Sequence, residues 1–339
     1  NLREHGCCGA RTVHSALGKT PNEDFLSPVR WATIRMVVVD EASMLSIEML
    51  AGILCKMPAT CSLVLIGDPN QLGSVGSGNV IPDLLELGFP VTRLTQQYRQ
   101  AVKDNALRYN VTHFPELNDK DDLKFDRSFN LVPANEKNIC DVVKREAAKR
   151  YRDGEEIQVI TGTNKDVYQL NRVIQEAVNP PLPTKPEITH RGVTVRKNDR
   201  VTILRNNREK SCVNGDVGIA KKMTVFHEKD QFADVTIALS KEREVKYLES
   251  EIGWDVVLAY AMTAHRSQGS QYDTVIVMLP PKCPNVLRRN FLYTAISRAK
   301  KQVILVGSEE ALHMAMTTPA ETRKSKLVTK VHQKLHFAA

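Results

Sequence analysis

The sequence predicts an α/β protein built from two similar lobes, with a small β-rich insert in the second lobe. Short apolar segments alternate with longer amphipathic segments in the first third of the chain, and the same alternation returns later. A stretch of prolines and short β-like runs interrupts the second series. Of the 339 residues, 42% are hydrophobic and 25% are charged, which excludes collagen-like and disordered classes.

The first lobe is expected to alternate between strand and helix. Apolar runs predict strands at residues 34–39, 62–66 and 91–94, and amphipathic stretches predict helices at 46–56 and 80–87. Parallel strands need a long crossover, which is usually a helix. This alternation therefore indicates a parallel sheet with helices packed on it.

The second lobe is expected to repeat this pattern. The sequence predicts helices at residues 137–151 and 166–178, and strands at 157–161, 274–279 and 302–306. We therefore expect two lobes of the same α/β kind.

The insert begins after a segment that cannot form regular structure. Four prolines between residues 180 and 186 exclude a helix or a central strand. Short β-like runs follow, and Asn214, Gly215 and Asp216 form a turn signal between two of them. The runs lie at residues 193–195, 200–204, 217–221 and 233–239.

Domain boundaries follow from these changes in pattern. Residues 1–95 are assigned to the first lobe, 181–251 to the insert, and 96–180 with 252–339 to the second lobe. The basic tail, residues 322–337, is predicted to be a helix on the surface.

Charge and cysteine content limit the kinds of binding partner and the cellular compartment that the sequence allows. Lys and Arg outnumber Asp and Glu by 47 to 39, and the net charge of +8 is compatible with a polyanionic partner. Seven cysteines without a C-x-x-C pair predict neither a disulfide framework nor a zinc site, so we expect an intracellular protein with reduced thiols. The longest run without a polar residue, 256–262, is too short for a membrane span of about 18 residues.

Two carboxylates follow the first predicted strand. Asp40 and Glu41 stand where an α/β sheet presents its ligand-binding edge. An Asp there can hold a magnesium ion against nucleotide phosphates, and a neighbouring Glu can deprotonate an attacking water. The alternative is an acidic pair that begins a helix, where the helix dipole favours it.

A polar, glycine-rich loop, residues 67–76, follows the second predicted strand. Asp68 adds a carboxylate at this strand end, and Gln71 can hydrogen-bond a terminal phosphate. The alternative is an ordinary turn, for which glycine and asparagine suffice.

Later segments carry further candidate contacts. Tyr98 can stack on a base, and Arg99 can reach a phosphate. Residues 290–300 read as a helix whose end points Arg298 out of the fold, although such an arginine is often only a partner of the helix dipole. Residues 260–270 gather groups that suit nucleic-acid phosphates, among them Thr263, His265, Ser267, Gln268 and Gly269.

Taken in order, five motifs resemble motifs II to VI of superfamily 1 DNA helicases, most closely the RecD-like group of the 5′-to-3′ branch. They are DEAS (40–43), GDPNQLGSVG (67–76), QQYRQ (96–100), YAMTAHRSQGSQYD (260–273) and LYTAISRAKKQVILVG (292–307). Thr12, Val13 and His14 resemble motif Ia, where the surface that tracks the DNA strand begins. The resemblance covers nearly the whole chain.

This resemblance implies a motor of two RecA-like lobes of the P-loop NTPase type, with ATP and Mg²⁺ in the cleft and single-stranded DNA across the top. Asp40 would bind the magnesium ion, Glu41 would be the catalytic base, and Gln71 would be the γ-phosphate sensor. Arg99 and Arg298 would be arginine fingers. The nucleotide would also contact Asp68, Tyr98 and Gly269, and the DNA would contact Thr12, His14, Thr263, His265, Ser267 and Gln268.

The insert resembles the small barrel that RecD-like enzymes carry in their second lobe. The implied substrate is single-stranded DNA, or a duplex with a 5′ single-stranded tail. Several basic residues of the insert would border the strand channel, namely Arg191, Arg196, Lys197, Arg200, Arg205, Arg208 and Lys210.

The phosphate-binding loop, G-x-x-x-x-G-K-[ST], has no match. Gly18, Lys19 and Thr20 imitate its end, but Val13 stands in place of the first glycine and Pro21 follows where the helix should start. In the family this loop precedes motif Ia. We therefore expect it upstream of Asn1, a first lobe without its first strand and helix, and an inactive chain when these residues act alone.

Two other functions stay open. One is a non-catalytic nucleic-acid-binding subunit that keeps the helicase fold without phosphate binding. The other is the helicase part of a conjugative relaxase, which shares these motifs and whose relaxase domain would lie upstream.

Overall fold

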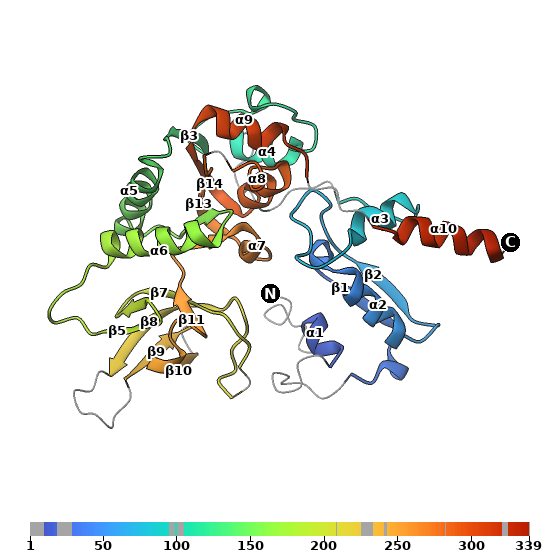
Figure 1. Cartoon of the computed structure of the whole chain (residues 1–339), viewed down its shortest axis with the longest axis horizontal. Coiled ribbons are helices and arrows are strands. Elements are labelled where there is room, and N and C mark those ends of the chain that lie inside the picture. The colour runs from blue at the N-terminus through green and yellow to red at the C-terminus, as the bar shows by residue number, and fades with distance from the viewer. Residues whose placement is uncertain are drawn as a thin grey trace.

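The computed structural model describes most of the chain and contains two lobes built on parallel strands and one antiparallel domain (Figure 1). The predicted α/β class with a β-rich insert in the second lobe is confirmed. No helix in the described residues is long and apolar enough to cross a membrane. The described ranges are 10–18, 29–94, 99, 105–207, 209–224, 233–240, 243–281, 283–320 and 325–338.

The first lobe pairs two parallel strands, with Val38 opposite Val64. Ser46 begins the main helix of this lobe, because its hydroxyl accepts a hydrogen bond from the N–H of Met49 (3.3 Å). The elements are β1 (Met36–Val39), β2 (Ser62–Leu65), α1 (Val13–Ala16), α2 (Ile47–Lys56) and α3 (Val80–Glu86). Both strands and the two longer helices confirm predicted elements.

Residues 91–94 form no strand, so that prediction is wrong. All four residues are exposed, and Leu94 is 90% exposed. No described strand lies beside them, and the segment includes Thr92 and Arg93, so an isolated strand there would gain little from burial.

One face of the β1–β2 pair is covered and the other is open. Val39 and Leu65 pack with α2 in the core of the first lobe. Met36, Val38 and Val64 point to the other face, where they are 58%, 52% and 39% exposed. Parallel sheets are normally covered on both faces. The described part of the first lobe therefore presents an uncovered apolar surface.

The second lobe contains a five-stranded parallel sheet in the order β12-β4-β13-β14-β3. The predictions cover the three inner strands but neither edge strand. The strands are β3 (Phe129–Pro133), β4 (Ile157–Thr161), β12 (Ala261–Thr263), β13 (Tyr272–Met278) and β14 (Ala299–Gly307).

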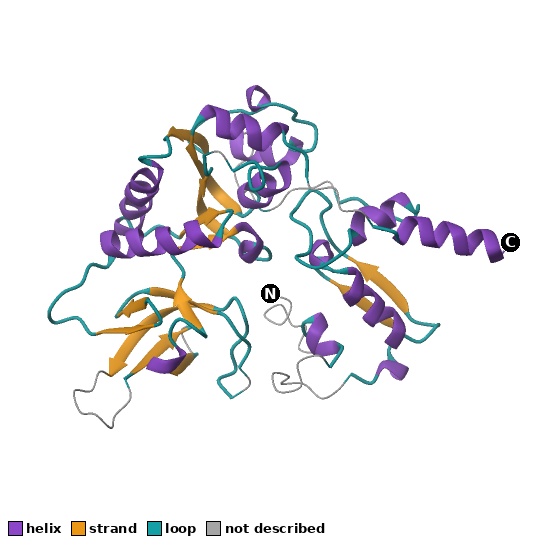
Figure 2. Ribbon diagram, viewed as in Figure 1, coloured by secondary structure: helices purple, strands orange, loops and turns teal. Residues whose placement is uncertain are grey.

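Helices cover both faces of this sheet (Figure 2). Ile276 of β13 packs in the core under α5 and α6, and Val277 packs in the core under α4, α8 and α9. Successive strand residues point to opposite faces, so a strand covered on both sides is apolar throughout. The helices are α4 (Ala106–His113), α5 (Ile139–Arg152), α6 (Asn164–Val178), α8 (Arg289–Ile296) and α9 (Glu309–Thr317), and the short α7 (Ala264–Ser267) follows β12.

The insert is an antiparallel sheet in the order β10-β9-β8-β7-β11, with a separate β5–β6 hairpin. Because β11 pairs with β7, the insert sheet extends beyond the predicted boundary at residue 251. The strands are β5 (Glu187–His190), β6 (Val193–Arg196), β7 (Arg200–Ile203), β8 (Val217–Thr224), β9 (Asp234–Ala238), β10 (Glu244–Leu248) and β11 (Val256–Leu258).

The C-terminal helix α10 (Leu327–Ala338) lies against α3 of the first lobe (Figure 1). The tail is helical as predicted, but it packs on the first lobe, whereas the sequence pattern assigns residues 252–339 to the second. The short 3-10 helices are η1 (Trp31–Thr33), η2 (Ala42–Met44), η3 (Lys120–Asp122) and η4 (Glu249–Glu251).

Candidate functional site

The loop after β1 holds the two predicted carboxylates in a restricted conformation. Glu41 has a φ of 50°, in the left-handed region that few residues other than glycine adopt. Its N–H donates to Oδ1 of Asp40 (2.9 Å), and η2 starts at the next residue. Asp40 is exposed and Glu41 is half-buried. Such backbone strain is frequent at functional sites.

Ser43 joins this loop to the loop after β2. Its hydroxyl donates to the carbonyl of Asp68 and accepts from the N–H of Asp68, both at 2.8 Å. Gly67 allows this close approach, because a Cβ there would lie 2.9 Å from the backbone nitrogen and from Oγ of Ser43. The two polar strand ends are therefore held together by a serine that the sequence analysis overlooked, although it is the last residue of the DEAS motif.

Asp68 organises the loop that contains Gln71. Its Oδ1 accepts from the N–H of Asn70 (3.0 Å), and its Oδ2 lies 3.4 Å from Nε2 of Gln71. Tyr293 of the second lobe also hydrogen-bonds Asp68, and burial together with this carboxylate raises the pKa of Tyr293. Oε1 of Gln71 is buried and has no hydrogen-bond partner among the described residues. The Gln71 amide thus retains capacity to bind a further group.

Arg298 is buried, which corrects the prediction that it points out of the fold. Only 1% of it is exposed. Its Nε donates to the carbonyl of Thr294 (3.1 Å) and its Nη2 to Oγ of Ser297 (3.0 Å). The free carbonyls at the end of α8 attract the guanidinium inward. Nη1 is buried without a hydrogen-bond partner in the described part of the chain, so an additional acceptor there would be stabilising.

Arg99 lies beside Arg298, and both face carboxylates of the first lobe. Nη1 of Arg99 donates to the carbonyl of Ser297. Burial lowers the pKa of Arg298 and the charge of Arg99 lowers it further, whereas Glu41 and Asp68 act to raise it. Burial also lowers the pKa of Arg99, against an opposing effect of Glu41. Two partly desolvated guanidiniums side by side favour a multiply charged anion between the lobes.

Two hydrogen bonds join the loop after β2 directly to the second lobe. The N–H of Leu72 donates to Oγ1 of Thr294 (2.8 Å), and the carbonyl of Leu72 accepts from Nε2 of Gln268 (2.9 Å). Thr294 is not among the predicted site residues. Thr294 precedes Arg298 by four residues, a spacing that puts both side chains on one face of a helix. This spacing could have identified Thr294 from the sequence.

The donors of residues 260–270 have different roles. Thr263 caps α7, because its Oγ1 accepts from the N–H of Arg266 (3.3 Å). Ser267 is fully buried, and its hydroxyl donates to the carbonyl of Ala264 (2.8 Å) inside α7. Gly269 follows α7 with a φ of 76°. Apart from its chain neighbours, no described atom lies within 4 Å of the place where a Cβ would stand.

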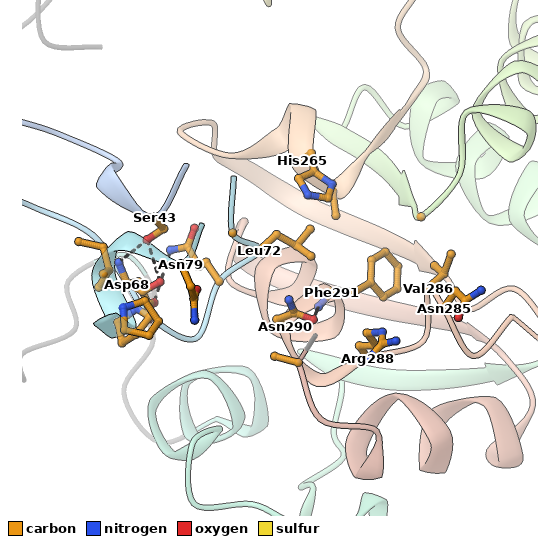
Figure 3. Close-up of a pocket in the computed structure, with 18 residues that line it drawn as sticks. Ser43, Asp68, Leu72, Asn79, His265, Asn285, Val286, Arg288, Asn290 and Phe291 are labelled. Carbon is orange, nitrogen blue, oxygen red and sulfur yellow. Dashed lines mark hydrogen bonds between the residues drawn. The ribbon is translucent and has the colours of Figure 1, made fainter. Parts of the chain in front are cut away.

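A cavity of about 270 Å³ lies between the two lobes (Figure 3). Asp68 and Asn79 line it from the first lobe, and His265, Arg288 and Phe291 line it from the second. The polar and basic groups of this lining suit the phosphates of a nucleic-acid strand, whereas Phe291 is packed into the core of the second lobe.

The predicted contacts at the start of the chain lie on a short helix. Thr12 and His14 are exposed, and Oγ1 of Thr12 also caps α1 by accepting from the N–H of Ser15 (3.2 Å). Gly18 ends α1 with a φ of 71°, and its N–H donates to the carbonyl of Ser15 (3.0 Å). This is the geometry of a helix C-terminus, whereas a phosphate loop opens into a helix N-terminus. Tyr98 lies outside the described residues.

Several basic residues of the insert that are predicted to border the strand channel instead pair with groups of the protein itself. Arg196 is 6% exposed and pairs with Glu176 (2.8 Å) and Glu187 (2.9 Å), which contradicts a place on the strand channel. Lys210 pairs with Glu251 (2.5 Å). Arg200 donates to the carbonyl of Ile157 (2.7 Å). Arg191, Lys197 and Arg205 are exposed, and Arg208 lies outside the described residues.

The carboxylate at the end of β1 fits a magnesium ion. Mg²⁺ is commonly held by one or two carboxylates together with water and nucleotide phosphates. Across the described ranges, no group of three or more His, Cys, Asp or Glu side chains could hold a metal ion on its own. Asp40 would therefore share the ion with phosphate oxygens.

Three family sequence models match the chain. An AAA domain model matches residues 1–125, and a UvrD-like helicase C-terminal domain model matches residues 258–306. The SH3 domain model of ATP-dependent RecD-like DNA helicases matches residues 170–238, which include most of the insert.

Similar curated proteins are longer than this chain. The ATP-dependent RecD2 DNA helicase of Deinococcus radiodurans is 27% identical over 337 residues, which cover 95% of this chain and 43% of the relative. The RecBCD enzyme subunit RecD of Mycobacterium tuberculosis is 28% identical over 350 residues, which cover 92% of this chain and 56% of the relative. The chain thus spans about half the length of these relatives.

Solved structures show the same fold at lower identity. The Pif1 helicase from Bacteroides, in complex with ADP-AlF3 and single-stranded DNA, has a TM-score of 0.55 at 16% identity, over 97% of this chain and 84% of that chain. The Pif1 helicase from Candida albicans has a TM-score of 0.54 at 14% identity, over 98% and 83%. The three family models and the two curated relatives together support a similarity to RecD-like superfamily 1 helicases, and the solved structures show the same fold.

Proposed function

We propose that the chain is the motor part of an ATP-dependent helicase that moves 5′ to 3′ along single-stranded DNA. The observation that carries the proposal is the convergence of Arg99 and Arg298 with Glu41 and Asp68 between the lobes. A bound polyphosphate would reduce the repulsion between the guanidiniums and supply the acceptor that Nη1 of Arg298 lacks among the described residues. The direction of movement rests on the resemblance to the RecD-like group.

Six polar residues of the cleft have roles in this proposal. Asp40 would hold Mg²⁺, which would neutralise phosphate charge. Glu41 accepts a proton from the attacking water, and Gln71 orients that water and senses the terminal phosphate. Arg99 and Arg298 stabilise the charge that develops in the transition state. Asp68 keeps the Gln71 loop in place.

Strand binding and hydrolysis are coupled across the cleft. Single-stranded DNA, or the 5′ tail of a duplex, runs past His265 and the exposed Thr12 and His14. The hydrogen bond between Gln268 and Leu72 connects this surface to the loop of Gln71. Strand binding that draws the lobes together therefore favours the closed nucleotide site.

The missing phosphate loop limits what these residues do by themselves. A phosphate loop supplies a cradle of backbone N–H groups for the β- and γ-phosphates, and the 339 residues contain no match to it. We infer that this chain alone hydrolyses ATP poorly. The same feature favours the second candidate, a non-catalytic nucleic-acid-binding subunit.

A comparison of ATP with ADP binding tests the nucleotide assignment. It uses the whole protein, by which we mean the longer parent expected to carry the phosphate loop upstream of Asn1. We expect the double variant Arg99→Ala, Arg298→Ala to weaken ATP binding about 10- to 100-fold, as for the loss of charged hydrogen bonds. ADP binding should change little, because the fingers address the terminal phosphate. Lys301→Ala is the control, since Lys301 is an exposed cation that pairs with Asp273 (2.5 Å). Equal losses for ATP and ADP, or none, would contradict the assignment.

Polarity is tested with two tailed duplexes. The whole protein should unwind a duplex with a 5′ single-stranded tail and leave the same duplex with a 3′ tail paired. Preferential unwinding of the 3′-tailed duplex would exclude the proposed direction. No unwinding of either, with intact strand binding, would favour the non-catalytic candidate.

A further inference from the structure

Trp254 is an exposed aromatic side chain on the insert, in the turn that leads into β11. It is 48% exposed, although burying a tryptophan is strongly favourable. The guanidinium carbons of Arg205 and Arg191 lie 4.1 Å and 5.0 Å from the centre of its ring. Both arginines are among the predicted strand contacts of the insert, but the tryptophan beside them is not.

Contacts between three chain segments fix this cluster. Gly253 has a φ of 76°, and a Cβ there would lie 3.0 Å from Cβ of Arg191. The N–H of Leu204 donates to the carbonyl of Asp255 (2.8 Å), which ties the segment of Arg205 to the turn. A cluster that is already ordered loses little conformational entropy when it binds a partner.

The two guanidiniums keep capacity to bind an anion. Stacking on a ring uses the flat face of a guanidinium and leaves its N–H edge available. Nε of Arg205 forms an ion pair with Oδ1 of Asp255 at 3.6 Å, a distance too long for a strong hydrogen bond, so the other N–H groups of this guanidinium remain available. Arg191 and Arg205 are both exposed.

We propose that Trp254, Arg191 and Arg205 form a single-strand contact, in which bases stack on the exposed ring and on the guanidinium planes while the N–H edges meet phosphates. Aromatic rings beside arginines bind single strands in this way without sequence preference. The chain connects the cluster through β11 and β12 to Thr263, in the segment to which the proposed function assigns strand binding. The inference rests on that function and adds a contact point on the insert.

Tryptophan fluorescence provides a direct test, because the chain has two tryptophans, Trp31 and Trp254. In a Trp31→Phe background, the emission of the full chain comes from Trp254 alone. Titration with an oligothymidylate should quench this emission with the same midpoint as strand binding measured by anisotropy, since a stacked base quenches indole fluorescence.

Substitutions test the energetic contribution. Trp254→Ala should weaken oligothymidylate binding about 5- to 100-fold, whereas Trp254→Phe should retain most of the affinity. Arg191→Ala with Arg205→Ala should lower the slope of log affinity against log salt by about 1.4, because each single-strand phosphate contact contributes about 0.7. The matched control is Arg243→Ala, an insert cation that pairs with Asp216 (2.6 Å) and should leave the affinity unchanged.

The outcomes separate this inference from the proposed function. If the wild-type chain binds the strand but Trp254 emission and Trp254→Ala affinity do not respond, the inference is overturned and strand binding elsewhere stands. If the wild-type chain does not bind the strand, both are overturned. If Trp254→Phe binds as weakly as Trp254→Ala and both melt earlier than wild type, Trp254 has a packing role and the contact is rejected.

Discussion

Gln268 of the second lobe donates its side-chain amide to the backbone carbonyl of Leu72 in the first lobe, across 2.9 Å. Leu72 directly follows Gln71, and Gln268 directly follows α7, so one hydrogen bond joins the proposed phosphate sensor to the proposed strand-binding segment. Oε1 of Gln268 is buried and has no hydrogen-bond partner within the described ranges. A side chain held in this way responds to any change in the separation of the lobes.

We predict that Gln268→Ala uncouples strand binding from hydrolysis in the whole protein. Loss of the donor leaves the Leu72 carbonyl unsatisfied, at a cost of about 1–3 kcal/mol in the closed state. ATPase assays should show a stimulation by single-stranded DNA that is about tenfold weaker, with an unchanged rate in its absence. Gln271→Ala, an exposed glutamine nearby, is the control. Wild-type stimulation in Gln268→Ala would show that the bond does not carry the coupling.

The chain of 339 residues is expected to hydrolyse ATP poorly even with DNA present. Its cleft offers carboxylates and guanidiniums but no phosphate loop to hold the β- and γ-phosphates. Phosphate release by the purified chain should stay near background across a range of DNA concentrations. Turnover at ordinary helicase rates would mean that Gly18, Lys19 and Thr20 bind phosphate despite their setting.

In the whole protein, Glu41→Gln should abolish hydrolysis and spare nucleotide binding. The amide cannot accept the proton of the attacking water, while the magnesium and guanidinium contacts stay in place. Hydrolysis and nucleotide affinity are measured on the same preparation, with Glu86→Gln, an exposed carboxylate on α3, as the control. Near-normal turnover in Glu41→Gln would give Glu41 a structural role in the left-handed turn.

Arg298→Ala in the whole protein should lower turnover by about 10³ to 10⁵, the usual contribution of an arginine finger. Single-strand affinity should change little, because Arg298 is buried against α8. The paired variant Thr263→Ala, His265→Ala should show the opposite pattern, with weaker, salt-dependent strand binding. Loss of DNA affinity with a retained rate in Arg298→Ala would remove the main catalytic element of the cleft.

Asp126 should make the second lobe sensitive to acid. Burial acts to raise the pKa of Asp126, but hydrogen bonds from Ser128, Ala106 and Phe129 outweigh it, so the pKa lies below its ordinary value. The stability that Asp126 contributes is therefore present above the unfolded pKa of about 3.9 and is lost as the pH falls through the lower folded pKa.

The variant Asp126→Asn tests this, because its amide nitrogen cannot accept the N–H of Ala106. We expect a loss of about 1–2 kcal/mol in the free energy of unfolding at pH 7, as for a helix cap. Urea unfolding should show that the difference from wild type shrinks below about pH 4. Asp153→Asn, an exposed carboxylate at the end of α5, is the control. A difference that is constant with pH would show that Asp126 acts through packing.

Local pattern predicts elements well where periodicity and burial agree. β4, β13 and β14 are apolar on both faces and are recognisable from the sequence, as are the amphipathic α5 and α6. Residues 91–94 begin and end with apolar side chains but include Thr92 and Arg93, and they have no described partner strand. The short edge strand β12 is defined by its pairing with β4, which no local pattern reveals.

The candidate site likewise has features that the sequence predicts and features that it does not. The sequence alone determined the chemical groups and their order along the chain, because motif residues such as Asp40, Glu41 and Arg99 carry their chemistry wherever they lie. Only the tertiary structure decided that Arg298 turns inward and that Ser267 is used inside α7. It also decided that Trp254 lies beside two arginines. These outcomes depend on contacts between segments distant in sequence and on which hydrogen-bonding groups folding leaves unsatisfied, and neither is encoded in local spacing.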